Sequence, residues 1–322
     1  MKVLVTGGTG FVGTHLVNRL LQRGHRVAVL ARDPRKTVNR YNRPVEAVSG
    51  NVLDRESLAA AASGRDALIH LVGIIHETRD QSFDGMHREA AENAVAAAAS
   101  AGVARYLHMS AMGSSDDAPS EYARTKAAGE KAVRSSPLAW TIFRPSIIFG
   151  FGDGFVSLLA PIVRRNPGFI PVIGPGTTRF QPVAIDDVTR VFADALEKPD
   201  TARKAYEVGG PEVFTLDDIY REIAAAVGKP GKSLIHFPLW YGGLLAGAFE
   251  KFFEHPPLTR DQLKSLQRDN VGDISATVAE FPGEWKRFRP GIRAYLSSGR
   301  HDPRNGIGYD VELERRPVIR IR

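Results

Sequence analysis

Along the first half of the chain, short continuous apolar runs alternate with stretches in which apolar residues recur every three or four positions. Short, largely apolar runs predict buried strands, and apolar residues spaced three or four apart predict helices. The predicted strands are Lys2–Thr6, Arg26–Ala31, Val45–Ser49, Ala67–Leu71, Tyr106–Ser110 and Trp140–Arg144. The predicted helices are Phe11–Arg23, Arg55–Ala62, His87–Ala101 and Ser120–Arg134. Strands that alternate with helices indicate βαβ units, and therefore an α/β fold with a parallel sheet.

This regular alternation weakens after about residue 150, where segments rich in Gly and Pro occur at 150–154 and 173–177. The further predicted elements are Val156–Arg165, Asp187–Glu197, Ala205–Val208 and Leu216–Val227. The pattern predicts a first domain over residues 1–150 and a smaller C-terminal cap domain over 151–296. Segments near 180–210 are expected to return to the first domain. Residues 297–322 form a basic tail.

The composition is that of a globular protein, with 322 residues of which 43% are hydrophobic and 25% are charged. The absence of cysteine excludes disulfides and thiolate metal sites. The histidines show no spacing typical of a metal site, so no metal is expected. The chain enters a strand at once, so no secretory signal is expected. It also lacks a long apolar run, so no membrane-spanning helix is expected. We expect a cytoplasmic protein, or one held peripherally at the inner membrane.

Positive charge is concentrated at the C-terminal end. The formal net charge is +7, and residues 285–322 contain 10 Lys and Arg against 4 Asp and Glu. The rest of the chain is nearly neutral, and the tail lacks the interleaved aromatic residues of a single-strand nucleic-acid binder. No nucleic-acid partner is expected. The tail is interpreted as a solvated segment, with contact to anionic lipid or to a protein partner as the alternative.

A glycine pattern, G-x-x-G-x-x-G, joins the first predicted strand to the first helix. Glycines allow the backbone to turn tightly and to approach a pyrophosphate, and the helix N-terminus offers unpaired N–H groups to the phosphates. The position between a strand and a helix favours dinucleotide binding over a glycine turn without a ligand. The sheet is therefore predicted to be a Rossmann-type, doubly wound one. The expected contacts are Gly7, Thr9, Gly10, Phe11, Val12 and Gly13.

The end of the second strand bears on which dinucleotide is bound. NAD-specific sites usually place Asp or Glu there to bind the ribose 2′-hydroxyl, but Ala31 occupies this position and Arg32 follows it. Arg35 and Lys36 come soon after. Because a guanidinium suits a 2′-phosphate, NADP(H) is favoured over NAD(H). The alternative is that Arg32 is only a solvated loop charge.

Six stretches carry a family resemblance: Thr6–Gly13, Gly50–Asp54, His70–Gly73, Tyr122–Lys126, Arg144–Gly150 and Arg179–Val188. In their order and spacing, the chain resembles an extended or atypical short-chain dehydrogenase/reductase of the NAD-dependent epimerase/dehydratase superfamily. The resemblance implies that Asn51 and Val52 flank the adenine. It implies that the cofactor is lined by Leu71, Val72 and Gly73, and that Pro145, Ser146 and Ile148 lie near the nicotinamide.

The motif Tyr122-Ala-Arg-Thr-Lys126 places a phenol and an ammonium four residues apart, on one face of a helix. An ammonium beside a phenol is expected to lower the pKa of Tyr122, which then acts as general acid/base in hydride transfer. The resemblance implies that Lys126 also holds the nicotinamide ribose. A Tyr and a Lys on a helix surface are the alternative interpretation.

The third catalytic candidate is Ser110, at the end of the fifth predicted strand. The family resemblance implies a hydroxyl one or two residues further on, where Ala111 and Met112 stand. Ser114 is a second candidate to reach the site. His87 stands where an Asn often braces the site. These departures predict retained cofactor binding with weak or specialised catalysis.

Later motifs narrow the resemblance: Phe143–Gly150, Arg179–Val183, Gly209–Ile219, Pro257–Leu263 and Arg268–Val271. In series they are similar to the alpha-subcomplex subunit 9 family of respiratory complex I and its bacterial relatives. The resemblance implies an NADP(H)-binding protein with weak oxidoreductase activity, or with a role in complex assembly or quinone metabolism. The alternative is an active reductase or epimerase on a carbonyl or nucleotide-sugar substrate. The sequence identifies neither the substrate nor the oligomeric state.

Residues 237–253 (FPLWYGGLLAGAFEKFF) are strongly apolar and aromatic, yet too short and too interrupted to span a bilayer. Core packing in the cap is the preferred interpretation. The alternative is docking on a membrane surface or on a membrane-bound respiratory complex.

Overall fold

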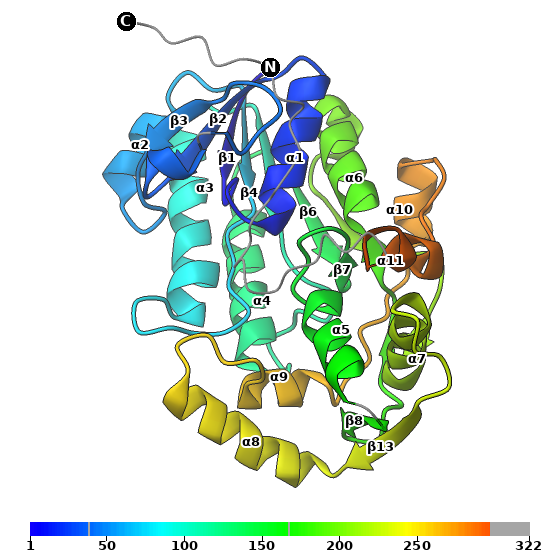
Figure 1. The fold of residues 1–322 in the computed structure, drawn as a ribbon. Coiled ribbons are helices and arrows are strands. Elements are labelled where there is room, and N and C mark those ends of the chain that lie inside the picture. Colours follow the sequence, from blue (N-terminus) through cyan, green and yellow to red (C-terminus); the bar gives the residue numbers. More distant parts are fainter. Residues whose placement is uncertain (38, 167, 297–322) are drawn as a thin grey trace, which may run out of the picture.

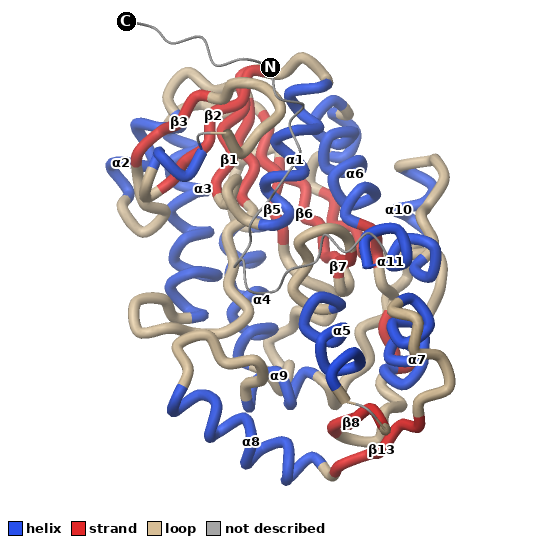
Figure 2. The backbone as a smooth tube through the Cα atoms, viewed as in Figure 1, coloured by secondary structure: helices blue, strands red, loops and turns tan. Residues whose placement is uncertain are grey.

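A computed structural model describes residues 1–37, 39–166 and 168–296. Its centre is a seven-stranded sheet in the order β11-β6-β5-β4-β1-β2-β3 (Figures 1 and 2). Every pair of neighbours in it is parallel. This is the doubly wound Rossmann order, extended by one edge strand. The strands are β1 (Lys2–Thr6), β2 (Arg26–Ala31), β3 (Glu46–Ser49), β4 (Ala67–His70), β5 (Arg105–Met109), β6 (Trp140–Pro145) and β11 (Lys204–Val208).

Helices cover both faces of this sheet, which is why its central strands are largely apolar and do not alternate strictly. Val3, Leu4 and Val5 of β1 are all fully buried. One face packs against α1 (Phe11–Gln22) and α6 (Ile185–Glu197). The other face packs against α2 (Arg55–Ala62), α3 (Ala90–Ser100) and α4 (Glu121–Arg134). The predicted α/β fold is confirmed.

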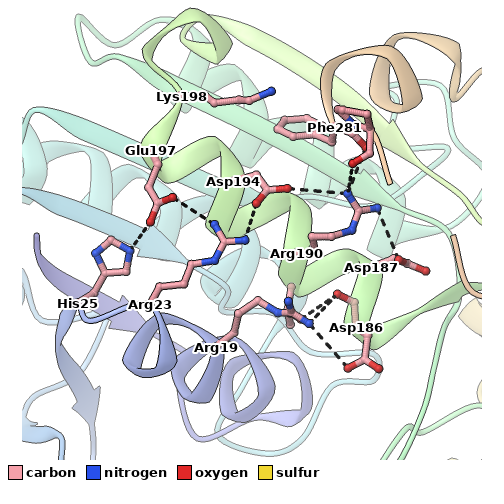
Figure 3. A network of polar contacts seen from close by, with 12 residues as sticks. Arg19, Arg23, His25, Asp186, Asp187, Arg190, Asp194, Glu197, Lys198 and Phe281 are labelled. Atoms are coloured by element: carbon pink, nitrogen blue, oxygen red, sulfur yellow. Dashed lines mark hydrogen bonds and ion pairs between the residues drawn. The ribbon is translucent and has the colours of Figure 1, made fainter. Parts of the chain in front are cut away.

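Polar contacts join α1 to α6, two helices far apart in the sequence (Figure 3). Arg23 bonds Asp194 at 2.5 Å and Glu197 at 3.3 Å, and Glu197 also bonds His25 at 2.9 Å. Arg19 donates to Thr189 at 3.0 Å. These contacts hold the glycine-loop helix against a helix from beyond residue 180.

The C-terminal part builds a third apolar cluster of its own. Its larger elements are α5 (Val156–Arg165), β8 (Phe169–Ile173), α7 (Leu216–Ala226), β13 (Ser233–Phe237), α8 (Leu239–Phe252) and α11 (Phe288–Leu296). The shorter ones are β7 (Ile148–Phe149), β9 (Arg179–Phe180), β10 (Val183–Ala184), β12 (Phe214–Thr215), α9 (Arg260–Ser265) and α10 (Ser275–Glu280). Short 3-10 turns are η1 (Pro34–Thr37) and η3 (Pro199–Thr201). Beyond residue 200, β11 rejoins the main sheet beside β6.

The helix expected over His87–Ala101 has an irregular start. A π-helical turn, η2 (Asp84–Glu89), comes first, and the regular α3 begins at Ala90. His87 therefore lies inside the π turn, a feature that is frequent at functional sites.

Most of the apolar segment at 237–253 forms α8, which lies along the outside of the molecule (Figure 1). Only Gly242 and Ala246 of this helix are buried, whereas Trp240 is 68% and Phe252 76% exposed. The core-packing interpretation is therefore wrong for its outer face, because only Gly242 and Ala246 are turned inward. Within the described ranges no helix combines the length and hydropathy needed to cross a membrane. The predicted basic tail, 297–322, lies outside the described residues.

Candidate functional site

The glycine loop lies between β1 and α1, at the carboxyl end of the central strand. Gly10 is the N-cap of α1, with extended backbone and no side-chain cap, so the first amides of the helix have no side-chain acceptor there. The Gly10 amide donates to the carbonyl oxygen of Gly7 at 3.1 Å, which closes the turn. Such a helix N-terminus is suited to a pyrophosphate.

Two of these glycines are required by the space around them. Gly7 has φ +75°, and a Cβ there would lie 3.0 Å from the carbonyl carbon of Leu71. A Cβ on Gly13 would lie 2.2 Å from the Gly7 carbonyl oxygen and 2.6 Å from the Gly8 Cα. Because all these neighbours are backbone atoms, the loop cannot yield to a side chain. The residues present therefore fit a dinucleotide.

Two residues that the sequence did not single out cover the outer side of this loop. Arg40 donates to the Thr9 carbonyl oxygen at 2.9 Å, and the Tyr41 hydroxyl donates to the Gly8 carbonyl oxygen at 3.0 Å. Both come from the segment between β2 and β3, which carries no motif. Only the tertiary structure brings them to the loop.

Arg32 follows β2 directly and is exposed, with no hydrogen bond or ion pair to any described residue. Arg35 is also exposed, but its guanidinium bonds Asp33 at 2.9 Å and 3.2 Å. The two neighbouring arginines thus differ in their readiness to meet an anionic ligand.

The predicted adenine and cofactor-lining residues surround the carboxyl ends of the same strands. Val52 is buried, and the exposed Asn51 accepts a hydrogen bond from the Leu53 amide at 3.1 Å. Leu71 is buried directly after β4. Pro145 ends β6, and Ile148 begins β7. Their contacts with a cofactor stay a prediction.

Lys126 is 4% exposed, and its ammonium lies against the loop after β4, residues 71–83. It donates to the carbonyl oxygens of Met109 at 3.3 Å and of Val72 at 3.5 Å. A Cβ on Gly73 would lie 2.6 Å from its Nζ, so only glycine leaves room for the ammonium in this position. With two acceptors for three N–H groups, one proton of the ammonium has no acceptor among the described residues.

Tyr122 lies one turn before Lys126 on α4, half-buried between two aromatic rings. Its ring centroid is 5.2 Å from that of His87 and 5.9 Å from that of Phe83, both edge-to-face. Its hydroxyl forms no hydrogen bond with a described residue, Ser110 included. No structural hydrogen bond with a described residue therefore engages the Tyr122 hydroxyl.

The expected lowering of the Tyr122 pKa is wrong for this structure. Burial raises the pKa of Tyr122 to about 12, since it disfavours the charged phenolate. Burial also lowers the pKa of Lys126 to about 8, against the opposing effect of Glu130. The Lys126 ammonium is directed at backbone carbonyls, so desolvation decides the protonation of the phenol.

His87 braces the loop after β4. Its Nε2 lies 3.1 Å from both the amide and the carbonyl of Ile74, and its Nδ1 lies 2.9 Å from the Thr125 hydroxyl. Burial, and then the charge of Lys126, lower the pKa of His87 to about 2, so the ring is neutral. His87 thus links α4 to this loop.

The serine candidates are drawn into other contacts. The Ser110 hydroxyl is buried and donates to that of Ser114 at 3.3 Å, and Ser114 donates to the Ala111 carbonyl at 2.7 Å. The Ser146 hydroxyl bonds Asn270 at 2.5 Å and 3.1 Å. The structure brings Tyr122 and Lys126 onto one helix face but does not join a serine to them.

Two more buried histidines lie behind Lys126, on adjacent strands. His70 and His108 are stacked with ring centroids 5.5 Å apart, and Thr6 bonds His70 at 2.8 Å. Both ring nitrogens of His108 are buried without a partner among the described residues. Burial lowers the pKa of His108 to about 3, with Lys126 acting in the same direction.

The amino end of α4 is capped from the C-terminal part of the chain. Asp261 of α9 accepts hydrogen bonds from the Glu121 amide at 2.7 Å and the Tyr122 amide at 3.1 Å. A carboxylate there satisfies two open amides and suits the helix dipole. The backbone of Tyr122 is therefore positioned by a residue 139 positions away.

Lys126→Met is expected to stabilise the protein at neutral pH by ~1–3 kcal/mol, because a buried ammonium disappears. The folded-state pKa of Lys126, about 8, lies below the value of 10.5 for the free side chain. Between these values the unfolded chain holds more protons, so the wild type gains stability as pH rises and the variant's advantage shrinks. Urea unfolding at pH 7 and pH 10 measures this.

Lys131→Met is the matched control, because Lys131 lies on the same helix with its side chain 66% exposed. Little change is expected for it at either pH. An advantage of Lys126→Met that is equal at both pH values would contradict a lowered pKa.

Residues 7–153 match the family model described as NAD(P)H-binding. The alpha subcomplex subunit 9 of mitochondrial NADH dehydrogenase from Dictyostelium discoideum is 31% identical over 281 residues, covering 84% of this chain and 77% of that protein. Its counterpart from Arabidopsis thaliana is 36% identical over 223 residues and 67% of this chain. The chain spans only 55% of that relative's length. A ceramide reductase of Caulobacter vibrioides is 35% identical over 238 residues, covering 73% of each chain.

Among solved structures, the fold is similar to that of a dTDP-glucose 4,6-dehydratase from Streptomyces venezuelae with NAD bound. The TM-score is 0.70 at 22% identity, covering 92% of this chain and 96% of that one. This likeness shows the fold, while the identity and coverage of the sequence relatives show the family. The chain belongs to the NAD(P)H-binding, extended short-chain dehydrogenase/reductase family that includes subunit 9 of the NADH dehydrogenase alpha subcomplex.

Proposed function

We propose that the protein is an NADP(H)-dependent oxidoreductase that reduces a carbonyl compound. The observation that carries this is the pair on α4, a buried ammonium and a phenol without a structural partner among the described residues. Both lie at the carboxyl end of the sheet, next to the loop after β4. If α4 were only a solvent-facing helix, its lysine would be exposed, whereas Lys126 is only 4% exposed.

The protonation states suit reduction. With the pKa of Tyr122 raised to about 12, the residue is a neutral phenol near pH 7 and can donate a proton to a carbonyl oxygen. Lys126 would hold the ribose of the cofactor, and His87 keeps the loop after β4 in place. A bound nicotinamide would supply the hydride to the carbonyl carbon and leave oxidised, so the products are an alcohol and NADP⁺.

The cofactor preference is proposed from the end of β2. Ala31 offers no carboxylate to a 2′-hydroxyl, and Arg32 is exposed without a partner among the described residues. Gly7, Gly10 and Gly13 would admit the pyrophosphate to the amino end of α1. NADP(H) is therefore favoured over NAD(H).

A second candidate function is that of an accessory subunit of a membrane-bound respiratory complex, with weak catalysis. The exposed apolar face of α8 and the subunit 9 relatives favour it. The two functions differ in turnover: NADPH consumption with a carbonyl or quinone panel supports the first. Binding of NADPH without any turnover supports the second.

Arg32→Ala is expected to weaken NADPH binding at least tenfold and to leave NADH binding nearly unchanged. A guanidinium that meets a phosphate makes charge-assisted hydrogen bonds that a neutral 2′-hydroxyl does not need. Thermal shift measures both, since a ligand of the folded state raises apparent stability by mass action.

Arg35→Ala is the control, because its guanidinium is engaged with Asp33. It should alter the NADPH shift much less than Arg32→Ala. Equal shifts with NADPH and NADH for the wild type would contradict the NADP(H) preference, and no shift with either would contradict the cofactor site.

A further inference from the structure

One face of α8 presents large apolar side chains to the outside. Trp240 is 68% exposed, Leu244 65% and Phe252 76%, with Tyr241 exposed beside them and Phe253 exposed directly after the helix. At 3.6 residues per turn, Trp240, Tyr241, Leu244 and Phe252 lie within about one third of the circumference of α8, so they share one side of the helix. We call these five residues the outer face of α8.

Gly242 and Ala246 are the residues of α8 that face the body of the protein. A Cβ on Gly242 would lie 2.4 Å from Ile173 Cγ2, and one on Gly247 would lie 2.3 Å from an Arg260 guanidinium nitrogen. Close contact through glycines holds the helix to the body and directs its large side chains outward. A surface helix that faces water has the opposite arrangement.

The same unit is joined to the candidate site. His255 lies just after α8, and its Nδ1 is 3.1 Å from Nε2 of His76. Gln262 of α9 donates to the Ile75 carbonyl oxygen at 3.4 Å. Both partners belong to the loop after β4, and Ile75 is itself 58% exposed. Asp261 of α9 caps the helix that carries Tyr122. In Figure 1, α8 and α9 lie beyond the amino end of α4, on the side where the parallel strands have their carboxyl ends.

The aromatic residues of this face and the composition of the chain's last residues favour a lipid occupant. On α8 the exposed Lys251, its ammonium 5.8 Å from the Phe252 ring, stands beside the exposed Glu250, and the exposed Glu254 follows, so the helix itself has no net positive charge. The last eight residues of the chain, 315–322, contain four arginines and no acidic residue. Stable attachment to a membrane takes two such signals, an apolar insertion and a basic segment that meets anionic lipid. Trp and Tyr are the residues enriched at the membrane interface.

We propose that the outer face of α8 inserts into the interface of an anionic phospholipid bilayer, and that the protein takes an amphiphilic, long-chain carbonyl substrate from that bilayer. The substrate class rests on the proposed reductase function, whereas the lipid surface does not. The physical reason is proximity: the face that meets lipid is attached to the loop and the helix that form the site.

The first test is flotation of the full chain with vesicles of phosphatidylcholine and phosphatidylglycerol. The wild type should float, and the combined variant Trp240→Ser, Leu244→Ser, Phe252→Ser should bind at least tenfold less, because it buries far less apolar area. The control Val213→Ser, Val278→Ser changes two exposed apolar residues outside α8, 47% and 40% exposed, and should float as the wild type does. A wild type that stays unbound, or a triple variant that floats equally, overturns the lipid surface and favours a protein partner.

The second test compares a water-soluble methyl ketone with a long-chain one dissolved in the same vesicles, by NADPH consumption. The triple variant should lose at least tenfold in rate on the long-chain ketone and keep its rate on the soluble one. An unchanged thermal shift with NADPH shows that it is folded. Equal loss on both ketones, or on neither, overturns delivery from the bilayer. If the wild type turns over neither ketone, the proposed function fails, and delivery with it, while flotation still decides the lipid surface.

Discussion

Alanine at Gly13 is expected to abolish dinucleotide binding, with at least a hundredfold loss of affinity for NADPH. The added Cβ would lie 2.2 Å from the Gly7 carbonyl oxygen, with the Cα and the carbonyl carbon of Gly8 at 2.6 Å and 2.7 Å. The start of α1 must then move away from β1, and the amides that meet the pyrophosphate move with it. We also expect the free energy of unfolding to fall by ~3 kcal/mol, as in overpacked cores. Isothermal titration with NADPH and urea unfolding measure the two effects.

Gly243→Ala is the matched control, because this helical glycine has no atom within 4 Å of an added Cβ. It should leave NADPH affinity unchanged and gain up to ~1 kcal/mol in stability. If Gly13→Ala does not fold, Gly10→Ala replaces it, since its Cβ would lie at a tolerable 3.3 Å from the Gly7 oxygen. Wild-type affinity in Gly13→Ala would show that the pyrophosphate is bound elsewhere.

Tyr122→Phe is expected to lower kcat for carbonyl reduction at least a hundredfold, the range for loss of a general acid. Cofactor affinity should stay within about twofold of the wild type, because the phenol has no role in holding the dinucleotide. The fold should also persist, since the Tyr122 hydroxyl makes no hydrogen bond with a described residue. Single-turnover NADPH oxidation, measured with saturating cofactor, separates the chemical step from binding.

Tyr220→Phe serves as the control, a buried tyrosine of α7 in the C-terminal apolar cluster. It should leave kcat unchanged. A large loss of NADPH affinity in Tyr122→Phe would assign that residue to cofactor binding. Unchanged kcat would remove Tyr122 from catalysis and assign protonation of the carbonyl oxygen to another group.

The sheet was predictable because each central strand is largely apolar without strict alternation, as burial on both faces requires. The predicted strands over Lys2–Thr6 and Arg26–Ala31 agree residue for residue with β1 and β2. The helix predicted over His87–Ala101 differs at its start, where the π turn forms. That turn depends on packing against α4, where a Cβ on Gly129 would lie 2.4 Å from the His87 carbonyl oxygen. No local pattern records such a contact.

The candidate site divides in the same way. The glycine spacing and the Tyr122–Lys126 motif are local, so the sequence alone determined that both sets of residues lie at the carboxyl end of the sheet. The cap from Asp261 and the contacts of Arg40 and Tyr41 with the glycine loop join distant segments, so no sequence motif predicted them. The sequence also left α8 open, since its apolar residues suit a core as well as a surface.

The sequence by itself determined the fold class, the dinucleotide loop and the phenol–ammonium pair, because each follows from residue type and spacing. Tertiary structure alone decided how these groups behave. Burial raised the pKa of Tyr122 where proximity to Lys126 had been expected to lower it, because desolvation acts on the phenolate and the ammonium points at backbone carbonyls. It also decided which face of α8 meets the outside, because only the packed molecule shows that Gly242 and Ala246 are the residues turned inward.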